Sequence, residues 1–184
     1  MTAATMPLRL QGCTVRSWRA TDAPELALVA NDRGIWLNLR DVFPHPYRLE
    51  DAERFIGMIS AQDPMTSYAI DVGGAPVGSV GFRFGTDVER VTAEIGYWLG
   101  AGYRGKGIAT QAVRSVTGWA IDRYGLTRVF AHVFVTNHSS ARVLERCGFV
   151  REATLRRSVI KDGRVLDQWL YGFVPEGPDV DSDR

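Results

Sequence analysis

The sequence predicts a mixed α+β fold in which one strand–helix–strand unit is set among hairpins. Ile95, Tyr97 and Leu99 alternate with Glu94, Gly96 and Trp98 in the period-two pattern of a strand. Apolar side chains between Ile108 and Ala120 instead recur at helical spacing. The apolar run at residues 128–135 predicts a second strand, buried on both faces. Elements in this order predict a right-handed parallel crossover.

A glycine-rich turn joins the first of these strands to the helix. It contains Gly100, Gly102, Gly105 and Gly107. Glycine admits backbone angles that other residues resist, and a helix start presents free N–H groups with partial positive charge. Arg104 and Lys106 add full positive charges beside the turn. The turn therefore suits a phosphate or a pyrophosphate.

Two ligand classes fit this turn. Gly100, Gly105 and Lys106 satisfy the G-x-x-x-x-G-K pattern of a nucleotide-binding P-loop, but Gly107 stands where that loop needs Ser or Thr to hold Mg²⁺. Residues 104–109 also resemble Q/R-x-x-G-x-G/A, the turn with which GNAT acetyltransferases bind the pyrophosphate of coenzyme A. An ordinary glycine-rich connection is the third interpretation.

The rest of the sequence predicts the other strands and helices. We expect a strand at residues 14–20, a helix at 21–30, an irregular segment at 31–47, a helix at 49–62, a hairpin of 67–72 with 76–84, a short helix within 137–149 capped by Ser139 and ended by Gly148, and a last hairpin of 149–160 with 164–174. Residues 1–10 and 175–184 are expected to be loose ends of a single domain that covers residues 1–184.

Composition excludes several classes of function. A chain of 184 residues can bury the core of one domain, and its formal charge of +1 gives no electrostatic case for nucleic acid or an anionic membrane. No apolar run approaches a membrane span, and no signal peptide is apparent. Cys13 and Cys147 have no metal-ligand spacing and form no disulfide framework, and Cys147 suits a small buried position. We therefore expect a reduced, cytoplasmic enzyme without a metal.

The chain as a whole resembles the GNAT superfamily, and most closely its branch of ribosomal-protein N-terminal acetyltransferases of the RimJ/RimL type. The matching segments occur in family order across residues 15–173 and include residues 15–18, 43–47, 94–98, 103–109, 137–140 and 148–149. The resemblance implies a mixed, twisted sheet of about seven strands with helices on both faces. It also implies acetyl-CoA as the cofactor and acetyl transfer to a primary amine.

The resemblance also implies which residues hold the cofactor. Trp98 and Leu99 would offer backbone hydrogen bonds to its pantetheine arm, which Asn137 would also contact. Arg146, or Arg142, would reach a phosphate from the short helix. The pyrophosphate would lie against the turn, whose contact residues would be Arg104, Gly105, Lys106, Gly107, Ile108, Ala109 and Thr110.

The chemistry requires an unprotonated amine and favours protonation of the leaving thiolate. Glu94 stands where many family members place the base, although a salt-bridged strand carboxylate is an equal interpretation. Many relatives use as the acid a Tyr where this chain has Leu144. Ser140 is the substitute that the RimJ/RimL-type branch suggests, although a first-turn helix hydroxyl is as good an interpretation. His132 lies on an apolar strand and is expected to be a satisfied core residue, and no carboxylate partner for it can be read from the sequence.

The acceptor is the least determined part. Trp36, Phe43 and Tyr47 are expected to wall its pocket, and the acceptor is left open among a protein N-terminus, a polyamine, an amino acid and an aminoglycoside-like drug. Because neither cysteine falls on an expected catalytic element, transfer should be direct, in a ternary complex. The alternative is a GNAT-fold protein that binds coenzyme A without turnover. The last hairpin, with apolar residues such as Val165 and Trp169, is a candidate surface for a homodimer.

Overall fold

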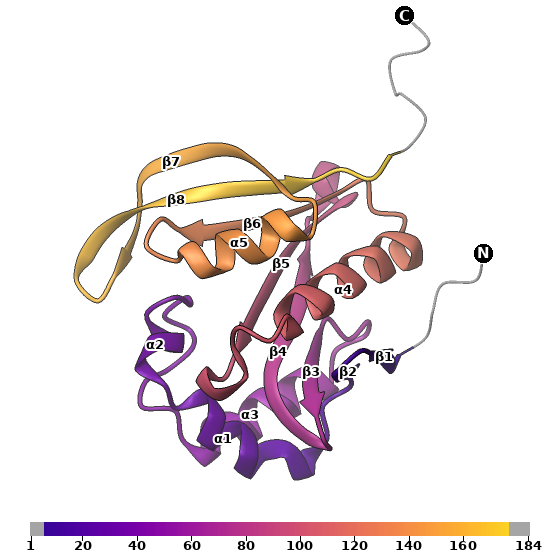
Figure 1. Cartoon of the computed structure of the whole chain (residues 1–184), viewed down its shortest axis with the longest axis vertical. Helices are drawn as coiled ribbons and strands as arrows, with labels where there is room; N and C mark the ends of the chain where they lie inside the picture. The colour runs from indigo at the N-terminus through magenta and orange to yellow at the C-terminus, as the bar shows by residue number, and fades with distance from the viewer. Residues whose placement is uncertain (1–5, 177–184) are drawn as a thin grey trace, which may run out of the picture.

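The computed structural model describes residues 6–176, and its strands form one mixed sheet with helices on both faces (Figure 1). The sheet order is β1-β2-β3-β4-β5-β6-β8-β7. The strands are β1 Leu8–Leu10, β2 Cys13–Arg16, β3 Ser67–Val72, β4 Ala75–Phe84, β5 Thr92–Leu99, β6 Arg128–Phe134, β7 Val150–Lys161 and β8 Arg164–Phe173. The helices are α1 Ala23–Ala30, α2 Arg33–Trp36, α3 Leu49–Ser60, α4 Ile108–Tyr124 and α5 His138–Arg146, with 3-10 turns η1 Ala20–Asp22, η2 Asp87–Glu89 and η3 Ala101–Tyr103. No helix within residues 6–176 is long and apolar enough to cross a membrane.

The predicted mixed fold is confirmed, with two differences near the N-terminus. The sheet has eight strands instead of seven, because Leu8–Leu10 pairs antiparallel with β2 and was wrongly expected to be loose. The other difference is α2, a single turn inside the segment expected to be irregular. Its start is fixed by Asp32, whose carboxylate accepts a hydrogen bond from the Gly34 amide, while Gly34 itself disfavours a helix in the sequence pattern. Residues 1–5 and 177–184, which the termini prediction also covered, lie outside the described residues.

The parallel pair β5–β6 is short, and this shapes the centre of the molecule. The two strands pair only at Thr92, Ala93 and Glu94, opposite residues 128–130, whereas all other neighbouring strands are antiparallel. The expectation that β6 is buried on both faces is wrong. Val129, Ala131 and Val133 are buried, but Phe130 and His132 are only half-buried. Because β5 and β6 pair only up to Glu94, the edge of β5 that faces β6 has no partner strand beyond that residue.

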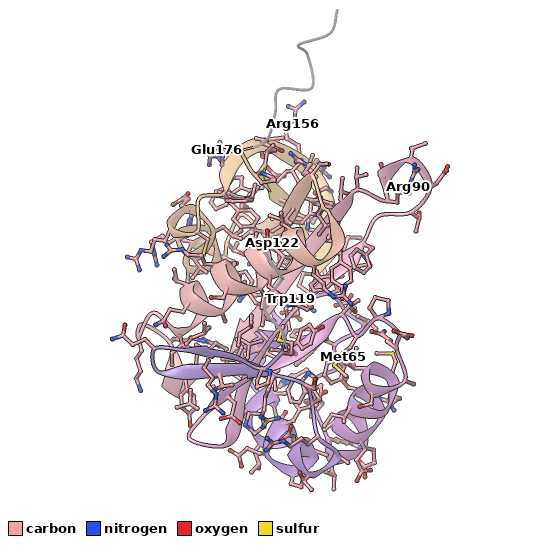
Figure 2. All side chains as sticks on the ribbon, turned by 90° about the vertical axis from the view of Figure 1, so that its right-hand side faces the viewer. Met65, Arg90, Trp119, Asp122, Arg156 and Glu176 are labelled. Carbon is pink, nitrogen blue, oxygen red and sulfur yellow. The ribbon has the colours of Figure 1, made fainter. Side chains whose placement is uncertain are left out.

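Two hydrophobic clusters cover the two faces of the sheet. On β3, Ala69 packs under α1 and α3, while its neighbours Tyr68 and Ile70 belong to the other cluster, under α4 and α5, as the alternation of a strand requires. Trp119 of α4, labelled in Figure 2, belongs to the cluster under α4 and α5. Its ring packs edge-on against Tyr68, with the ring centroids 5.6 Å apart. These contacts hold α4 firmly on the sheet, and so fix the turn that precedes the helix.

A buried ion cluster ties the N-terminal strands to the first helix. The guanidinium of Arg16 donates to Asp71 of β3 at 2.7 Å and to Asp22 at 2.6 and 2.9 Å. The side chains of these three residues are 10% exposed or less. Asp22 precedes α1 but caps no amide of that helix, because its carboxylate is occupied by Arg16 and by the Arg19 amide. Each charge in the cluster depends on its partners, since all three side chains are almost completely shielded from solvent.

This cluster gives the first prediction. Asp22→Ala should lower the free energy of unfolding by about 3 kcal/mol, because it leaves a buried guanidinium short of one partner. The matched control is Arg33→Ala, which breaks an arginine–aspartate pair whose side chains are 59% and 44% exposed and should cost less than about 1 kcal/mol. Urea unfolding followed by circular dichroism measures both. Equal losses in the two variants would contradict the account.

Candidate functional site

Two cavities adjoin where β5 and β6 separate. The first, of about 300 Å³, lies between the glycine-rich turn, α5 and the α2 segment. The second, of about 450 Å³, lies between β4, β5, β6 and the segment that follows α2. Both are lined by Asn38, Leu39, Tyr97, Trp98, Asn137 and Ser140. A ligand in each cavity could therefore meet at the end of β5.

The glycine-rich turn forms one end of the first cavity as a set of free backbone donors. Gly105 and Gly107 both have φ of +76°, in the left-handed region that favours glycine, and Gly107 is the N-terminal cap residue of α4. The first backbone bond into this helix is from Gln111 to Gly107, so the amides of the preceding three residues, 108–110, have no acceptor within the described part of the chain. Three unpaired amides at the start of a 17-residue helix make an anion site.

The charged residues around this turn do not all face the cavity. Arg104, Arg142 and Arg146 line it, although Arg104 also donates from Nε to the Leu99 carbonyl at 3.0 Å. Lys106 does not line the cavity, and its Nζ instead lies 5.6 Å from the ring centre of Tyr103. Most of the residues predicted to bind the cofactor therefore line the first cavity: the backbone of the turn, Trp98, Leu99, Asn137, Ser140 and Arg146. Lys106 is the exception.

Helix α5 begins at the boundary between the cavities. Its cap is Asn137, whose side-chain oxygen accepts from the Ser140 amide at 3.1 Å and from the Ser139 hydroxyl at 2.9 Å. The expectation that Ser139 is the cap is wrong, because Asn137 reaches the free amide first. The Asn137 side chain keeps its NH₂ group available, since only its oxygen is engaged.

A tyrosine that the sequence analysis passed over stands beside Ser140. The hydroxyl of Tyr97, on β5, lies 2.8 Å from the Ser140 hydroxyl and 2.9 Å from the Ser140 carbonyl oxygen. Burial raises the pKa of Tyr97, so its phenol stays protonated at any physiological pH. At the position where many relatives have a Tyr, Leu144 is fully buried in the core. A phenol is therefore present in the site, but it comes from the sheet instead of the helix.

Glu94 is the most strongly paired charge of the second cavity. Its carboxylate accepts from Arg40 at 2.8 and 3.0 Å, from Arg83 across the β4–β5 pair, and from His132 at 3.0 Å. Burial alone would raise the pKa of Glu94, but the His132 hydrogen bond and the two guanidinium groups outweigh it and lower the pKa to about 2. Glu94 is therefore ionised throughout the working range, and by itself it is a weak proton acceptor.

His132 has the carboxylate partner that the sequence did not reveal. Its Nδ1 meets Glu94 Oε1, its side chain is 25% exposed, and its ring lines the second cavity. The expectation of a core residue is wrong, because His132 is only half-buried and its ring faces this cavity. With Nδ1–H held by Glu94, Nε2 is the nitrogen left to accept a proton.

The aromatic residues predicted for the acceptor pocket divide into two groups. Phe43 and Tyr47 line the second cavity. Trp36 lines neither cavity, and its ring instead carries the Nζ of Lys161 at 4.0 Å from its centre. Lys161 is 3% exposed and also donates to Asp41 at 2.7 Å. Through Lys161, the tip of the last hairpin therefore holds the segment around α2, which lies beneath it in Figure 1. Residues of this segment line both cavities.

Neither cysteine lines a cavity. Both thiols are buried, and burial raises the pKa of each. Within residues 6–176 no cluster of three or more His, Cys, Asp and Glu side chains could hold a metal ion. The side chains in the two cavities that could carry or relay a proton include Glu94, His132, Tyr97 and Ser140.

Comparison with known proteins agrees with this arrangement. The family model described as Acetyltransferase (GNAT) domain matches residues 13–150. The protein named Probable N-acetyltransferase YjcK of Bacillus subtilis (strain 168) is 44% identical over 72 residues, which are 39% of this chain and 40% of that protein. The ribosomal-protein-serine acetyltransferase of Escherichia coli (strain K12) is 34% identical over 83 residues, 45% of this chain and 46% of that protein. The chain spans less than half the length of these two relatives.

Among solved structures, the microcin C7 self immunity acetyltransferase MccE, in complex with acetyl-CoA and AMP, is similar over 90% of this chain and 94% of that chain. The TM-score is 0.80 and the sequence identity 27%. The predicted resemblance is confirmed, and ribosomal-protein acetyltransferases occur among the relatives beside other members. The chain belongs to the GNAT family of acetyltransferases.

Proposed function

We propose that this chain is an acetyl-CoA-dependent N-acetyltransferase that acts on a primary amine by direct transfer within a ternary complex. The observation that carries the proposal is the meeting of two cavities at the end of β5, one with an anion-binding turn and the other with a carboxylate–histidine pair. A donor with a pyrophosphate fits the first cavity, and an amine fits the second. A protein that only bound coenzyme A would have no need of the second cavity's proton-accepting pair.

The residues of the first cavity suit coenzyme A. The free amides of residues 108–110 would hold the pyrophosphate, with Arg104 and Arg146 beside it. The unpaired edge of β5 offers backbone groups to the pantetheine amides, and those of Leu99 face that edge, whereas those of Trp98 face Ser79 of β4. Acetyl-CoA supplies the acetyl group as a thioester. A backbone N–H near the end of β5 would polarise the thioester oxygen.

In this proposal the proton of the amine is accepted by His132, directly or through water. Glu94 acts as a positioning residue, because its carboxylate holds Nδ1 and leaves Nε2 toward the cavity. It also stabilises the imidazolium that forms. This assignment modifies the expectation that Glu94 is itself the base, since a carboxylate with a pKa of about 2 competes poorly for the proton of an ammonium group.

The leaving thiolate is protonated, in this proposal, by the Ser140 hydroxyl. The single phenolic proton of Tyr97 lies within reach of the Ser140 carbonyl oxygen and of Ser140 Oγ, and in this proposal it turns to Oγ and frees the Ser140 hydrogen to point toward the sulfur. As the Ser140 proton passes to the sulfur, the Tyr97 proton passes to Oγ, and water returns a proton to the phenol oxygen. Because the Tyr97 phenol is neutral at working pH, the pair can donate a proton without first taking one up. No cysteine is placed to carry the acetyl group, which favours direct transfer.

A peptide or small-molecule amine is the proposed acceptor. A curated relative is named for acetylating a serine of a ribosomal protein, and MccE was solved with AMP in addition to acetyl-CoA. Two free buried thiols fit the reducing cytoplasm that we propose as its location. Homodimer formation through the last hairpin stays a prediction. Its outer strand β7 exposes Ile160 by 67%, and the neighbouring strand β8 exposes Val165 by 47%.

Donor binding at the turn gives the second prediction. Gly107→Ala should weaken acetyl-CoA binding roughly tenfold, because a Cβ at a φ of +76° costs about 1–2 kcal/mol in the geometry that exposes the amides. Gly102→Ala in the same turn is the control, since its added Cβ meets nothing within 4 Å and its φ is not positive. Isothermal titration with acetyl-CoA measures both. Equal affinities, or a preference for ATP–Mg over acetyl-CoA, would sink the assignment.

The base gives the third prediction. His132→Gln should lower kcat roughly 10²- to 10⁴-fold and remove the acidic limb of the pH–rate profile, because the proton acceptor is lost. Acetyl-CoA affinity should not change, since His132 does not line the first cavity. Glu94→Gln should lower kcat and shift that limb without abolishing it. His138→Gln, on a ring outside both cavities, is the matched control. An unchanged pH profile in His132→Gln would contradict the role.

The acid gives the fourth prediction. Ser140→Ala and Tyr97→Phe should each lower kcat with little change in acetyl-CoA affinity, and the double variant should lose no more than the worse single variant, because both act through one proton. Thiol release in the steady state measures kcat, and calorimetry measures affinity. If Ser140→Ala mainly loses acetyl-CoA affinity, Ser140 is a donor ligand and not the acid.

A further inference from the structure

Two arginines in the second cavity share a single carboxylate. Arg40, after α2, and Arg83, on β4, both donate from Nη2 to the same oxygen of Glu94, Oε2. Neither guanidinium has any other partner in the described residues, and only Nη2 of each is engaged, so each keeps at least three of its five N–H donors free. Both side chains are open to solvent, at 59% and 68% exposed, whereas Glu94 is 14% exposed.

The charges of this cavity do not balance. Its charged lining consists of Arg40, Arg83 and Glu94. Two guanidinium groups against one carboxylate leave an excess of one positive charge. An ammonium group that enters such a cavity is repelled unless its own molecule brings a compensating negative charge.

We propose that Arg40 and Arg83 form an anion subsite that selects acceptor amines carrying a carboxylate or a phosphate. The inference rests on the proposed acetyl transfer and names the substrate class of that reaction. Paired guanidinium groups with unused donors bind either anion through charge-assisted, often bidentate hydrogen bonds. Binding there also offsets the repulsion between the two arginines, which Glu94 alone now opposes.

The length of β5 sets the distance between the anion subsite and the point where the two cavities meet. Glu94 precedes Tyr97 and Trp98 by three and four residues, which is about 10–13 Å along β5 at the rise of a strand. An extended peptide advances about 3.3–3.6 Å per residue. A peptide amine at the cavity junction would therefore place its fourth or fifth residue beside Arg40 and Arg83. Polyamines and lysine-rich N-termini are the acceptors that this arrangement disfavours.

Matched peptides test the inference. Ten-residue peptides with a free N-terminus would differ only at position 4, as Glu, Gln, Lys or phosphoserine, and a fifth would carry Gln at position 4 and Glu at position 8. Thiol release with acetyl-CoA gives kcat/KM for each. The Glu and phosphoserine peptides should exceed the Gln peptide roughly 10- to 100-fold, and the Lys peptide should be worst. The comparison of Glu with phosphoserine tells a carboxylate preference from a phosphate preference.

Variants separate the subsite from the chemistry. Arg83→Gln and Arg40→Gln should each reduce the Glu-to-Gln ratio of kcat/KM toward one, whatever they do to turnover, because the ratio cancels any change shared by both acceptors. Arg123→Gln, an exposed arginine on α4, should keep the ratio. A ratio near one in the unmodified enzyme, equal activity with Glu at position 8, or a preference for Lys would overturn the subsite alone. No thiol release with any peptide or simple amine would overturn the proposed function and the subsite with it.

Discussion

The separation of β5 from β6 beyond Glu94 is the constraint on which the site depends. Parallel strands normally continue side by side, but these pair over only three residues. Each strand then has an edge without a partner, and backbone groups there must be satisfied by something other than the sheet. The two cavities meet in that gap. A donor along β5 would complete the hydrogen bonding that the sheet leaves open, and its thioester would end beside Ser140 and Tyr97.

Glu94 lies at the last position of β5 that pairs with β6, and its carboxylate is the negative charge to which the polar groups around the gap bind. A half-buried carboxylate is costly alone, and three partners from three different elements stabilise it as an anion. The same pairing changes its role, because a strongly stabilised carboxylate orients a histidine better than it accepts a proton. It also leaves two arginines with unused donors. One ion-paired residue thus links the proton acceptor to the choice of acceptor amine.

The sequence predicted the elements whose signals are local, and missed contacts between distant segments. The strand, glycine-rich turn and α4 were predicted correctly because period, glycines and capping all lie within residues 94–124. The partnership of His132 with Glu94 spans 38 residues and that of Arg40 with Glu94 spans 54, and no local pattern marks either. The apolar run of β6 suggested burial on both faces, since nothing in it shows that β5 turns away. Trp36 was assigned to the pocket only because its side chain is aromatic. Its ring is instead covered by the ammonium group of Lys161, which lies 125 residues further along the chain.

A crystal structure of the chain with acetyl-CoA tests the central claim most directly. The account predicts phosphate oxygens within hydrogen-bond distance of the amides of residues 108–110. It also predicts pantetheine along the open edge of β5, with the sulfur within reach of the Ser140 hydroxyl while the second cavity stays open to an amine. Density for the donor in the second cavity, or phosphates bound away from the turn, would contradict it.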